Sequence, residues 1–187
     1  MNEAGNEVRS VTEVLPKSEF LRVKAEMSVS YEMVAKQFLY NAATGDLIRL
    51  TGHRTTRGTP VAYKDNGGYL RVLIKGRLFF SHRVAWLLAY REWPASRIDH
   101  IDGNQANNAL CNLRLATAQL NMINSKLNKN NKTGFKGVFK EPNGRFSARL
   151  QSNRKTEHLG MFSTKELAAE AYAAAASRLF GEFVRPF

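Results

Sequence analysis

The first half of the chain alternates short apolar runs with turn residues, a pattern typical of a small mixed domain. Residues 31–38 predict a short helix, and residues 47–50 predict a strand. Two further apolar runs, 69–74 and 77–80, flank a two-residue turn and predict a β-hairpin. A helix is predicted from 82 to about 90, because a Trp-Pro pair ends it.

A strand, a long polar loop, a second strand and a helix are predicted to follow in that order. The strands are residues 97–101 and 113–115, and the loop between them, 102–112, is rich in Asn. Thr117 is placed to cap the helix, and the apolar side chains of the helix share one face: Leu120, Ile123 and Leu127.

The last third of the chain has its own pattern. Residues 128–133 carry no apolar side chain, which is typical of a linker. Beyond them, short apolar runs predict three strands: 137–139, 146–150 and 158–162. A capping box, Ser163-Thr-Lys-Glu166, opens an alanine-rich helix that Gly181 ends. Small side chains on one face of that helix would let it lie close against the sheet.

Together these elements predict an α+β chain with two small domains joined by a flexible linker. Residues 1–26 show no sustained period, so the N-terminal segment is predicted to be a flexible tail, and Met27 is an alternative start. The predicted boundaries are 1–27 for the tail, 28–127 for the first domain, 128–131 for the linker and 132–187 for the second domain.

The charge of the chain indicates a polyanionic partner. The formal net charge is +12, and residues 125–187 carry twelve basic and five acidic side chains, a net charge of +7. Nucleic acid is the usual partner of such a protein, although a generally basic or ribosome-associated protein would share the composition. Cys111 is the single cysteine, which excludes a disulfide within the chain. With no long apolar run and a polar N-terminus, we expect no membrane association and a cytoplasmic location.

The strongest chemical cluster follows the first strand of the strand–loop–strand–helix unit. Hydrolysis of a phosphodiester needs a base for water and a positive charge for the transition state. His100 can supply the base, and a hard divalent ion held by oxygen ligands can supply the charge. Because adjacent residues of a strand face opposite ways, Asp99 and His100 can take different roles. Asn121 could bring an amide oxygen to an ion held by Asp99, and Asn124 is a competing choice.

At this cluster the chain resembles the HNH endonucleases in their ββα-metal form, over roughly residues 28–125. The resemblance is to the phage and intron-encoded members. It implies that His100 is the general base, that Asp99 and Asn121 are metal ligands, and that Asn112 braces the loop and orients His100. The family's last histidine is Asn121 here, and an Asp/Asn ligand pair favours Mg²⁺, with Mn²⁺ possible, over Zn²⁺.

The segment from about residue 132 to the end resembles an AP2-type DNA-binding domain, on motifs such as Gly134-Phe-Lys-Gly-Val-Phe139. That resemblance implies a three-stranded antiparallel sheet, backed by one helix, that lies in the major groove of duplex DNA. Alternate residues of a strand share a face. The candidates for the DNA-contacting face are Lys136, Lys140, Arg145 and Arg149, with Arg154 meeting backbone phosphates from a turn.

The sequence therefore predicts a metal-dependent DNA endonuclease that uses its second domain to bind double-stranded DNA. By resemblance it would act as a phage or homing-type enzyme in a bacterial or phage-infected cell, and no protein partner is implied. The main alternative is a sequence-specific DNA-binding protein with an inactive HNH core. A second alternative, an RNA-binding protein, lacks support from any aromatic-rich single-strand platform.

Overall fold

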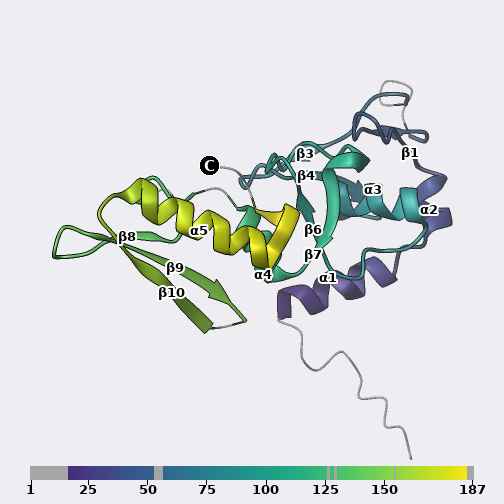
Figure 1. Cartoon of the computed structure of the whole chain (residues 1–187). Helices are drawn as coiled ribbons and strands as arrows, with labels where there is room; N and C mark the ends of the chain where they lie inside the picture. The colour runs from purple at the N-terminus through teal and green to yellow at the C-terminus, as the bar shows by residue number, and fades with distance from the viewer. Residues whose placement is uncertain (1–16, 53–56, 126, 129, 154, 185–187) are drawn as a thin grey trace, which may run out of the picture.

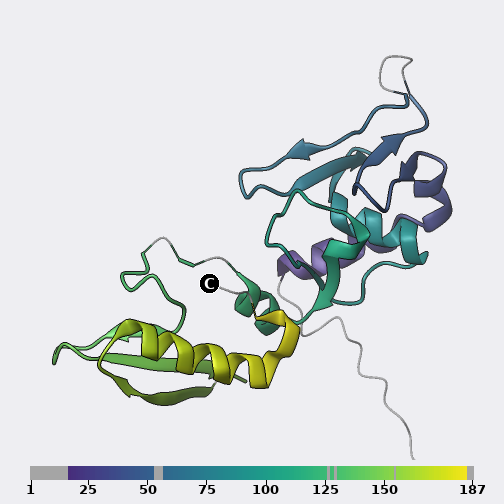
Figure 2. The ribbon, with the colours of Figure 1, turned by 45° about the horizontal axis from the view of Figure 1, so that its top comes forward.

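The computed structural model describes residues 17–52, 57–125, 127–128, 130–153 and 155–184. Their elements form two lobes (Figure 1). We call the described residues up to 125 the core lobe and residues 130–184 the C-terminal lobe. Turned by 45°, Figure 2 shows that the lobes lie apart and meet at one short helix and the end of the last helix. Within the described residues, no helix has the length and apolar character needed to cross a membrane.

The core lobe begins with a helix where the sequence predicts a flexible tail. Residues 17–27 form α1 (Lys17–Met27). Glu26 is buried and forms an ion pair with Arg83, whose Nη2 donates to Glu26 Oε2 at 2.8 Å. The tail prediction is therefore wrong for this segment, because a partner 57 residues away fixes a helix that has no clear apolar period of its own. The rest of the predicted tail, residues 1–16, lies outside the described residues.

Two small sheets and two helices build the middle of the core lobe. Helix α2 (Tyr31–Ala35) leads into β1 (Phe38–Tyr40), which pairs antiparallel with β2 (Leu47–Arg49). The second sheet has the order β3-β4-β5 and the helix α3 follows it directly; these elements are β3 (Tyr63–Lys64), β4 (Leu70–Ile74), β5 (Arg77–Phe80) and α3 (Ser81–Tyr90). Their apolar faces meet in one buried cluster, which includes Val34, Phe38, Ile74, Val84 and Leu87.

The predicted strand–loop–strand–helix unit is confirmed. Strand β6 (Arg97–His100) pairs antiparallel with β7 (Leu113–Ala116), and a short 3₁₀ turn, η2 (Leu110–Asn112), ends the loop between them. Helix α4 (Ala118–Asn124) follows. As predicted, Thr117 caps α4, because its hydroxyl accepts a hydrogen bond from the backbone N–H of Leu120 at 3.2 Å.

The C-terminal lobe is a three-stranded antiparallel sheet covered on one face by one helix. The strand order is β10-β9-β8, and the elements are β8 (Val138–Lys140), β9 (Phe146–Ser152), β10 (Lys155–Phe162), α5 (Lys165–Phe180) and the 3₁₀ turn η3 (Gly181–Phe183). The helix packs closely because its buried side chains are mostly alanines. Gly137, at φ +65°, must be glycine, because a Cβ there would lie 2.3 Å from the ring of Tyr172.

The beginning of the C-terminal lobe lies within the predicted linker. Asn131 Oδ1 accepts hydrogen bonds from the backbone N–H groups of Thr133 and Gly134, at 3.1 and 2.7 Å. Thr133 is buried, and its hydroxyl donates to the carbonyl of Val138 at 3.0 Å. The side chain of Asn131 therefore belongs to the fold of the lobe, although we had assigned it to the linker.

Candidate active site

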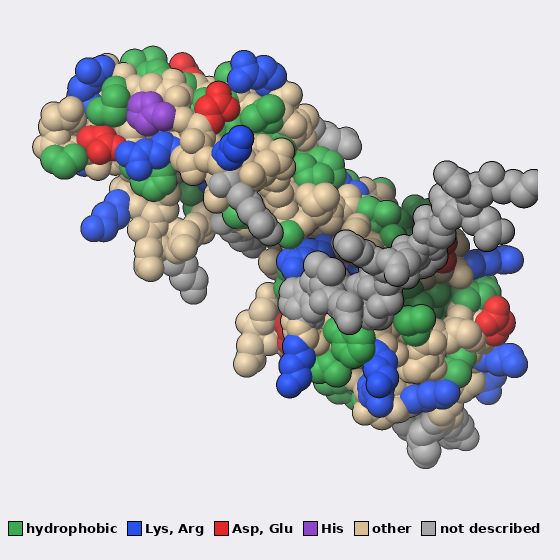
Figure 3. All heavy atoms as spheres, turned by 90° about the horizontal axis from the view of Figure 1, so that it is seen from below, with side chains coloured by type: hydrophobic (Ala, Val, Ile, Leu, Met, Phe, Trp, Pro, Cys, Tyr) green, Lys and Arg blue, Asp and Glu red, His purple; other side chains and the backbone are tan. Residues whose placement is uncertain are grey.

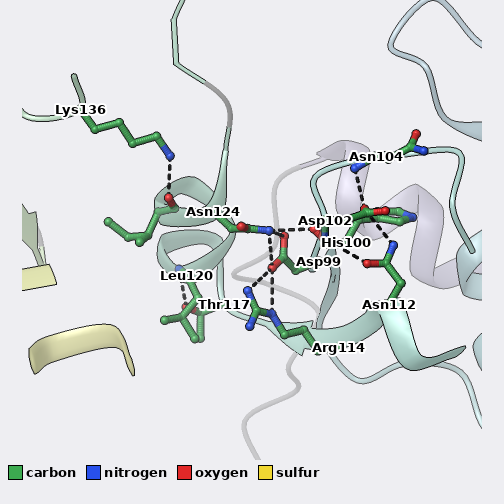
Figure 4. A network of polar contacts seen from close by, with 11 residues as sticks. Asp99, His100, Asp102, Asn104, Asn112, Arg114, Thr117, Leu120, Asn124 and Lys136 are labelled. Atoms are coloured by element: carbon green, nitrogen blue, oxygen red, sulfur yellow. Dashed lines mark hydrogen bonds and ion pairs between the residues drawn. The ribbon is translucent and has the colours of Figure 1, made fainter. Parts of the chain in front are cut away.

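Strand β6 places Asp99 and His100 at one small hollow. Both side chains are buried, at 3% and 4% relative exposure. The hollow has a volume of about 160 Å³, and the polar side chains of Asn121 and Asn124 line it together with Asp99 and His100. Figure 4 shows Asp99 between α4 on one side and Arg114 of β7 on the other. The structure thus brings together three of the four residues predicted for catalysis and metal binding.

The carboxylate of Asp99 is held by donors from two elements. Arg114 Nε donates to Oδ2 at 3.0 Å, and the register of β6 and β7 pairs these two residues directly. Asn124 Nδ2 lies 3.0 Å from each carboxylate oxygen. Among the described residues, Oδ2 therefore meets both Arg114 and Asn124, whereas Oδ1 has only the Asn124 contact. Since a carboxylate oxygen can accept two bonds, Oδ1 retains room for a cation.

The two candidate amides of α4 differ in what they contact. Asn124 is buried, and its Nδ2 also donates to the carbonyl oxygen of His100 at 2.7 Å. A carboxylate and a carbonyl only accept hydrogen bonds, so the nitrogen end of the Asn124 amide must face Asp99. The half-buried Asn121 also lines the hollow, and no side-chain hydrogen bond to another described residue fixes its amide. Asn124 therefore orients Asp99, and Asn121 is the amide whose oxygen is available to a ligand in the hollow.

The imidazole of His100 is held through Nε2, which lies 3.1 Å from Oδ1 of Asn108. An amide oxygen only accepts, so Nε2 carries the ring proton and Nδ1 keeps its lone pair. Burial lowers the pKa of His100, and the contacts that favour its charged form, from Asn108, Asp102 and Asp99, offset this effect only in part. The ring is therefore neutral at neutral pH, as a general base must be before it accepts a proton.

Asn108 orients His100, a role that the sequence did not assign to it. It is almost fully buried, and its backbone carbonyl accepts a hydrogen bond of 2.7 Å from the hydroxyl of Tyr40. Burial raises the pKa of Tyr40 to about 12, so this hydroxyl remains a donor. Gly45 also packs against Asn108, because a Cβ at Gly45 would lie 2.3 Å from the carbonyl carbon of Asn108. The core lobe thus fixes the position of Asn108 from two directions.

Asn112 has the bracing role that we expected but not the orienting one. Its Oδ1 accepts from the backbone N–H of Asp102 at 2.9 Å, and its Nδ2 donates to Asp102 Oδ1 at 2.9 Å. Asn107 donates to the other carboxylate oxygen at 2.7 Å. Burial alone would raise the pKa of Asp102, but hydrogen bonds from Asn104, Asn107 and Asn112 lower it. Asn112 therefore acts on the loop through Asp102, whereas Asn108 is the residue that contacts the imidazole.

Aromatic rings pack against the imidazole of His100. The ring of His82 meets it edge to face, with centroids 5.1 Å apart, and Tyr69 lies at 6.1 Å. His82 in turn stacks on Phe80. Burial, with further contributions from His100 and Arg83, lowers the pKa of His82 well below its usual range. His82 is therefore a neutral packing partner, and sequence alone gave it no defined role.

The basic residues predicted to contact DNA do not share one face of the C-terminal sheet. Lys140 lies opposite Phe146 in the β8–β9 register, and Phe139 lies opposite Ser147. Lys140 is therefore on the same pleat as the residues buried against α5, and it is exposed only because β8 ends there. The prediction that Lys140 shares a face with Arg149 is wrong. The register pairs Lys140 with Phe146, and Phe146 lies on the opposite face of β9 from Arg149.

Arg149 lies on the outer face of β9, where it is exposed beside the ring of Phe139 and bonds Glu141 at 2.7 Å. Arg145 is exposed just before β9 and donates to the carbonyl of Met161 at 2.9 Å. Lys136 is turned away from this face, because its ammonium donates to the carbonyl of Ile123 at the end of α4, at 2.6 Å (Figure 4). Its placement on the DNA face is therefore wrong. Arg154 lies outside the described residues.

Basic side chains are not confined to the C-terminal lobe. Residues 27–124 contain twelve Lys and Arg against six Asp and Glu. The face drawn in Figure 3 carries Lys and Arg side chains over both lobes. A polyanion bound along this face would therefore meet positive charge on both lobes.

A family model matches the segment that carries this site. Residues 79–123 match the family model described as HNH endonuclease, and this segment contains Asp99, His100, Asn112 and Asn121. An uncharacterized HNH endonuclease, L560, of Acanthamoeba polyphaga mimivirus is 40% identical over 89 residues, which cover 48% of this chain and 46% of that protein. Protein 3.8 of Escherichia phage T7 is 56% identical over 41 residues, which cover 22% of this chain and 34% of that protein.

A solved structure, titled DNA binding and cleavage by the HNH homing endonuclease I-HmuI, aligns with 24% sequence identity and a TM-score of 0.36. The alignment covers 46% of this chain and 49% of that one. The chain spans less than half the length of the two curated relatives. Residues 79–123 thus resemble the HNH endonucleases, and the family match and the mimivirus relative support a nuclease.

Proposed function

We propose that the chain is a metal-dependent endonuclease that hydrolyses phosphodiester bonds of double-stranded DNA. The observation that carries the proposal is the hollow at the end of β6. There an uncharged imidazole and a carboxylate oxygen with a free bonding position come from adjacent residues, His100 and Asp99. The HNH match over the same segment supports this function.

His100 acts as the general base in this mechanism. Its Nδ1 accepts a proton from a water molecule, which then attacks the phosphorus in line with the departing 3′ oxygen. Asn108 Oδ1 stays hydrogen-bonded to Nε2–H and stabilises the imidazolium that forms. Because burial lowers the pKa of His100, the ring is ready to accept a proton at neutral pH.

The oxygen atoms around the hollow fit a hard divalent cation. Among the described residues, no three His, Cys, Asp or Glu side chains come together to hold a metal. Asp99 Oδ1 and the amide oxygen of Asn121 would instead supply two ligands, as is usual for Mg²⁺, which keeps several waters and binds substrate phosphate. When bound, Mg²⁺ or Mn²⁺ supplies positive charge for the phosphoryl group and the leaving oxygen.

The C-terminal lobe binds duplex DNA, in the manner that the AP2-type resemblance implies. Its outer sheet face carries Arg149, with Arg145 at the edge, and is open because α5 covers the opposite face. Both guanidiniums can contact phosphates or the edge of guanine. By this proposal the sheet sets where the enzyme binds, and the hollow sets where it cuts.

Supercoiled plasmid incubated with Mg²⁺ tests the function. The native chain is expected to convert it to nicked or linear product, with 5′-phosphate ends, and EDTA is expected to stop the reaction. A mobility shift without cleavage would overturn the enzyme and leave a DNA-binding protein. An equal mixture of duplex DNA and RNA in the same assay tests the choice of substrate, and preferred cleavage of RNA would contradict the proposal.

A further inference from the structure

Helix α4 belongs to both lobes at once. Asn124, at its end, contacts the carboxylate of Asp99 in the core lobe. The adjacent Ile123 is buried in the apolar core of the C-terminal lobe, in the cluster that contains Val138 and Leu150. Figure 2 shows α4 at the junction between the lobes, next to the end of α5. Neighbouring residues of one short helix thus join the candidate metal ligand to a second hydrophobic core.

Polar contacts fix α4 to the C-terminal lobe at both of its ends. Near the first turn, Gln119 Nε2 donates to the hydroxyl of Ser152 at 3.2 Å, and Gln119 Oε1 accepts from the backbone N–H of Asn153 at 3.4 Å. At the last turn, Lys136 donates to the carbonyl of Ile123. A cation at this carbonyl also complements the negative end of the helix dipole. The helix is therefore held along its length by the C-terminal lobe.

A second connection between the C-terminal lobe and Asp99 runs through Arg114. The ring of Phe183, in η3, lies under the guanidinium of Arg114, with the Cζ atom 3.7 Å from the ring centroid. The same guanidinium holds Asp99 Oδ2 through Nε at 3.0 Å and Nη2 at 2.9 Å. The face of a guanidinium can stack on an aromatic ring while its edge donates to a carboxylate, so both contacts can exist together.

We propose that the C-terminal lobe is a built-in part of the metal site, in which Phe183 and Gln119 act as positioning residues for Asp99. This proposal rests on the proposed function of the hollow. The Phe183–Arg114 stack orients Oδ2, and the anchored α4 presents the amide groups of Asn121 and Asn124. If DNA held by the C-terminal sheet changes the affinity for a cation at Asp99, the cation changes the affinity for DNA by the same factor, because binding free energies are linked.

Mn²⁺ titration of the full chain, followed by calorimetry without DNA, tests the proposal. Phe183→Ala is expected to weaken Mn²⁺ binding about tenfold, the usual effect of removing a group that orients a metal ligand. Phe183→Tyr keeps the ring and is expected to restore near-native binding. Leu179→Ala removes an exposed apolar side chain nearby on α5 and is the matched control, with no change in Mn²⁺ affinity expected.

Gln119→Ala gives a second route to the same answer, because it removes both contacts to the β9–β10 turn and leaves Arg114 and Phe183 in place. It is expected to weaken Mn²⁺ binding severalfold while the chain stays folded at the temperature of the titration. Native Mn²⁺ affinity in both Phe183→Ala and Gln119→Ala would overturn the coupling alone. Absence of Mn²⁺ binding by the native chain would overturn the metal site itself, and the coupling with it.

Discussion

Asp99 and His100 are adjacent in sequence, yet their surroundings come from different parts of the molecule. The carboxylate of Asp99 is held by Arg114 and Asn124, and both of these are connected to the C-terminal lobe through Phe183 and Ile123. The imidazole of His100 is held by Asn108 and packed against His82, entirely within the core lobe. The alternation of side chains along β6 produces this division.

The comparison separates two functions that a nuclease must combine. The half of the hollow at His100 needs a neutral base in one tautomer, and a rigid, buried surrounding provides it. The half at Asp99 needs an oriented oxygen ligand, and residues connected to the C-terminal lobe hold it in place. Substitutions on the two sides should therefore affect different measurements, the rate of cleavage on one side and the affinity for metal on the other.

His100→Ala should have the largest effect on activity. Loss of the base is expected to lower the rate of plasmid cleavage by about 10²- to 10⁴-fold. Affinity for Mn²⁺ and for duplex DNA should stay within about twofold of the native value, because Asp99 and the C-terminal sheet remain. Gel assays of cleavage, with calorimetry and fluorescence anisotropy for binding, would check this. Retained cleavage would mean that His100 is not the base and that the two halves of the hollow do not have separate functions.

Glu26→Gln tests whether the His100 side is built as a rigid unit. Arg83, one residue after His82, would keep a buried charge without its partner, so the free energy of unfolding should fall by about 3–5 kcal/mol. Glu19→Gln is the matched control on the same helix, since the partly exposed Glu19–Arg22 pair should contribute about 1 kcal/mol or less. Urea unfolding measures both. Equal effects would mean that α1 does not brace α3.

The pattern of the chain was sufficient to predict the unit that carries the site. Period-two alternation on either side of an Asn-rich loop, followed by a capped helix, placed Asp99 and His100 on one strand and Asn121 near them. It could not predict which asparagine meets the imidazole, because the loop from residue 101 to 109 has no period. Only the folded path, fixed by Gly45 and Tyr40, brings Asn108 rather than Asn112 to His100.

Errors elsewhere have the same origin, in contacts between residues distant in sequence. Helix α1 was missed because its anchor is an ion pair with a residue 57 positions away. Lys140 was placed on the wrong face because sequence shows alternation within a strand but not the register between strands. Lys136 was assigned to DNA because a basic side chain in a basic segment gives no sign that a helix end lies beside it.

Two substitutions, one on each side of the hollow, test whether metal binding and base function are separate. Asn124→Ala should weaken Mn²⁺ binding about 10- to 100-fold, because Asp99 loses the amide that orients it. Asn108→Ala should leave Mn²⁺ binding near native but lower the rate of cleavage at saturating Mn²⁺ by about tenfold, because the tautomer of His100 is no longer fixed. If both variants changed both measurements equally, the two halves of the hollow would not be independent.

The smallest effect is expected on the outer face of the C-terminal sheet, and it tests how that lobe meets DNA. Arg149→Ala should weaken duplex binding a few-fold and reduce the slope of log affinity against log salt by about one. Lys140→Ala removes a charge of the same sign from the pleat on the α5 side, so its effect on that slope should be smaller. Anisotropy titrations at several salt concentrations give both slopes. Equal slopes for the two variants would mean that DNA meets the edge of the sheet, because only the edge at the end of β8 would leave Lys140 as close to phosphate as Arg149.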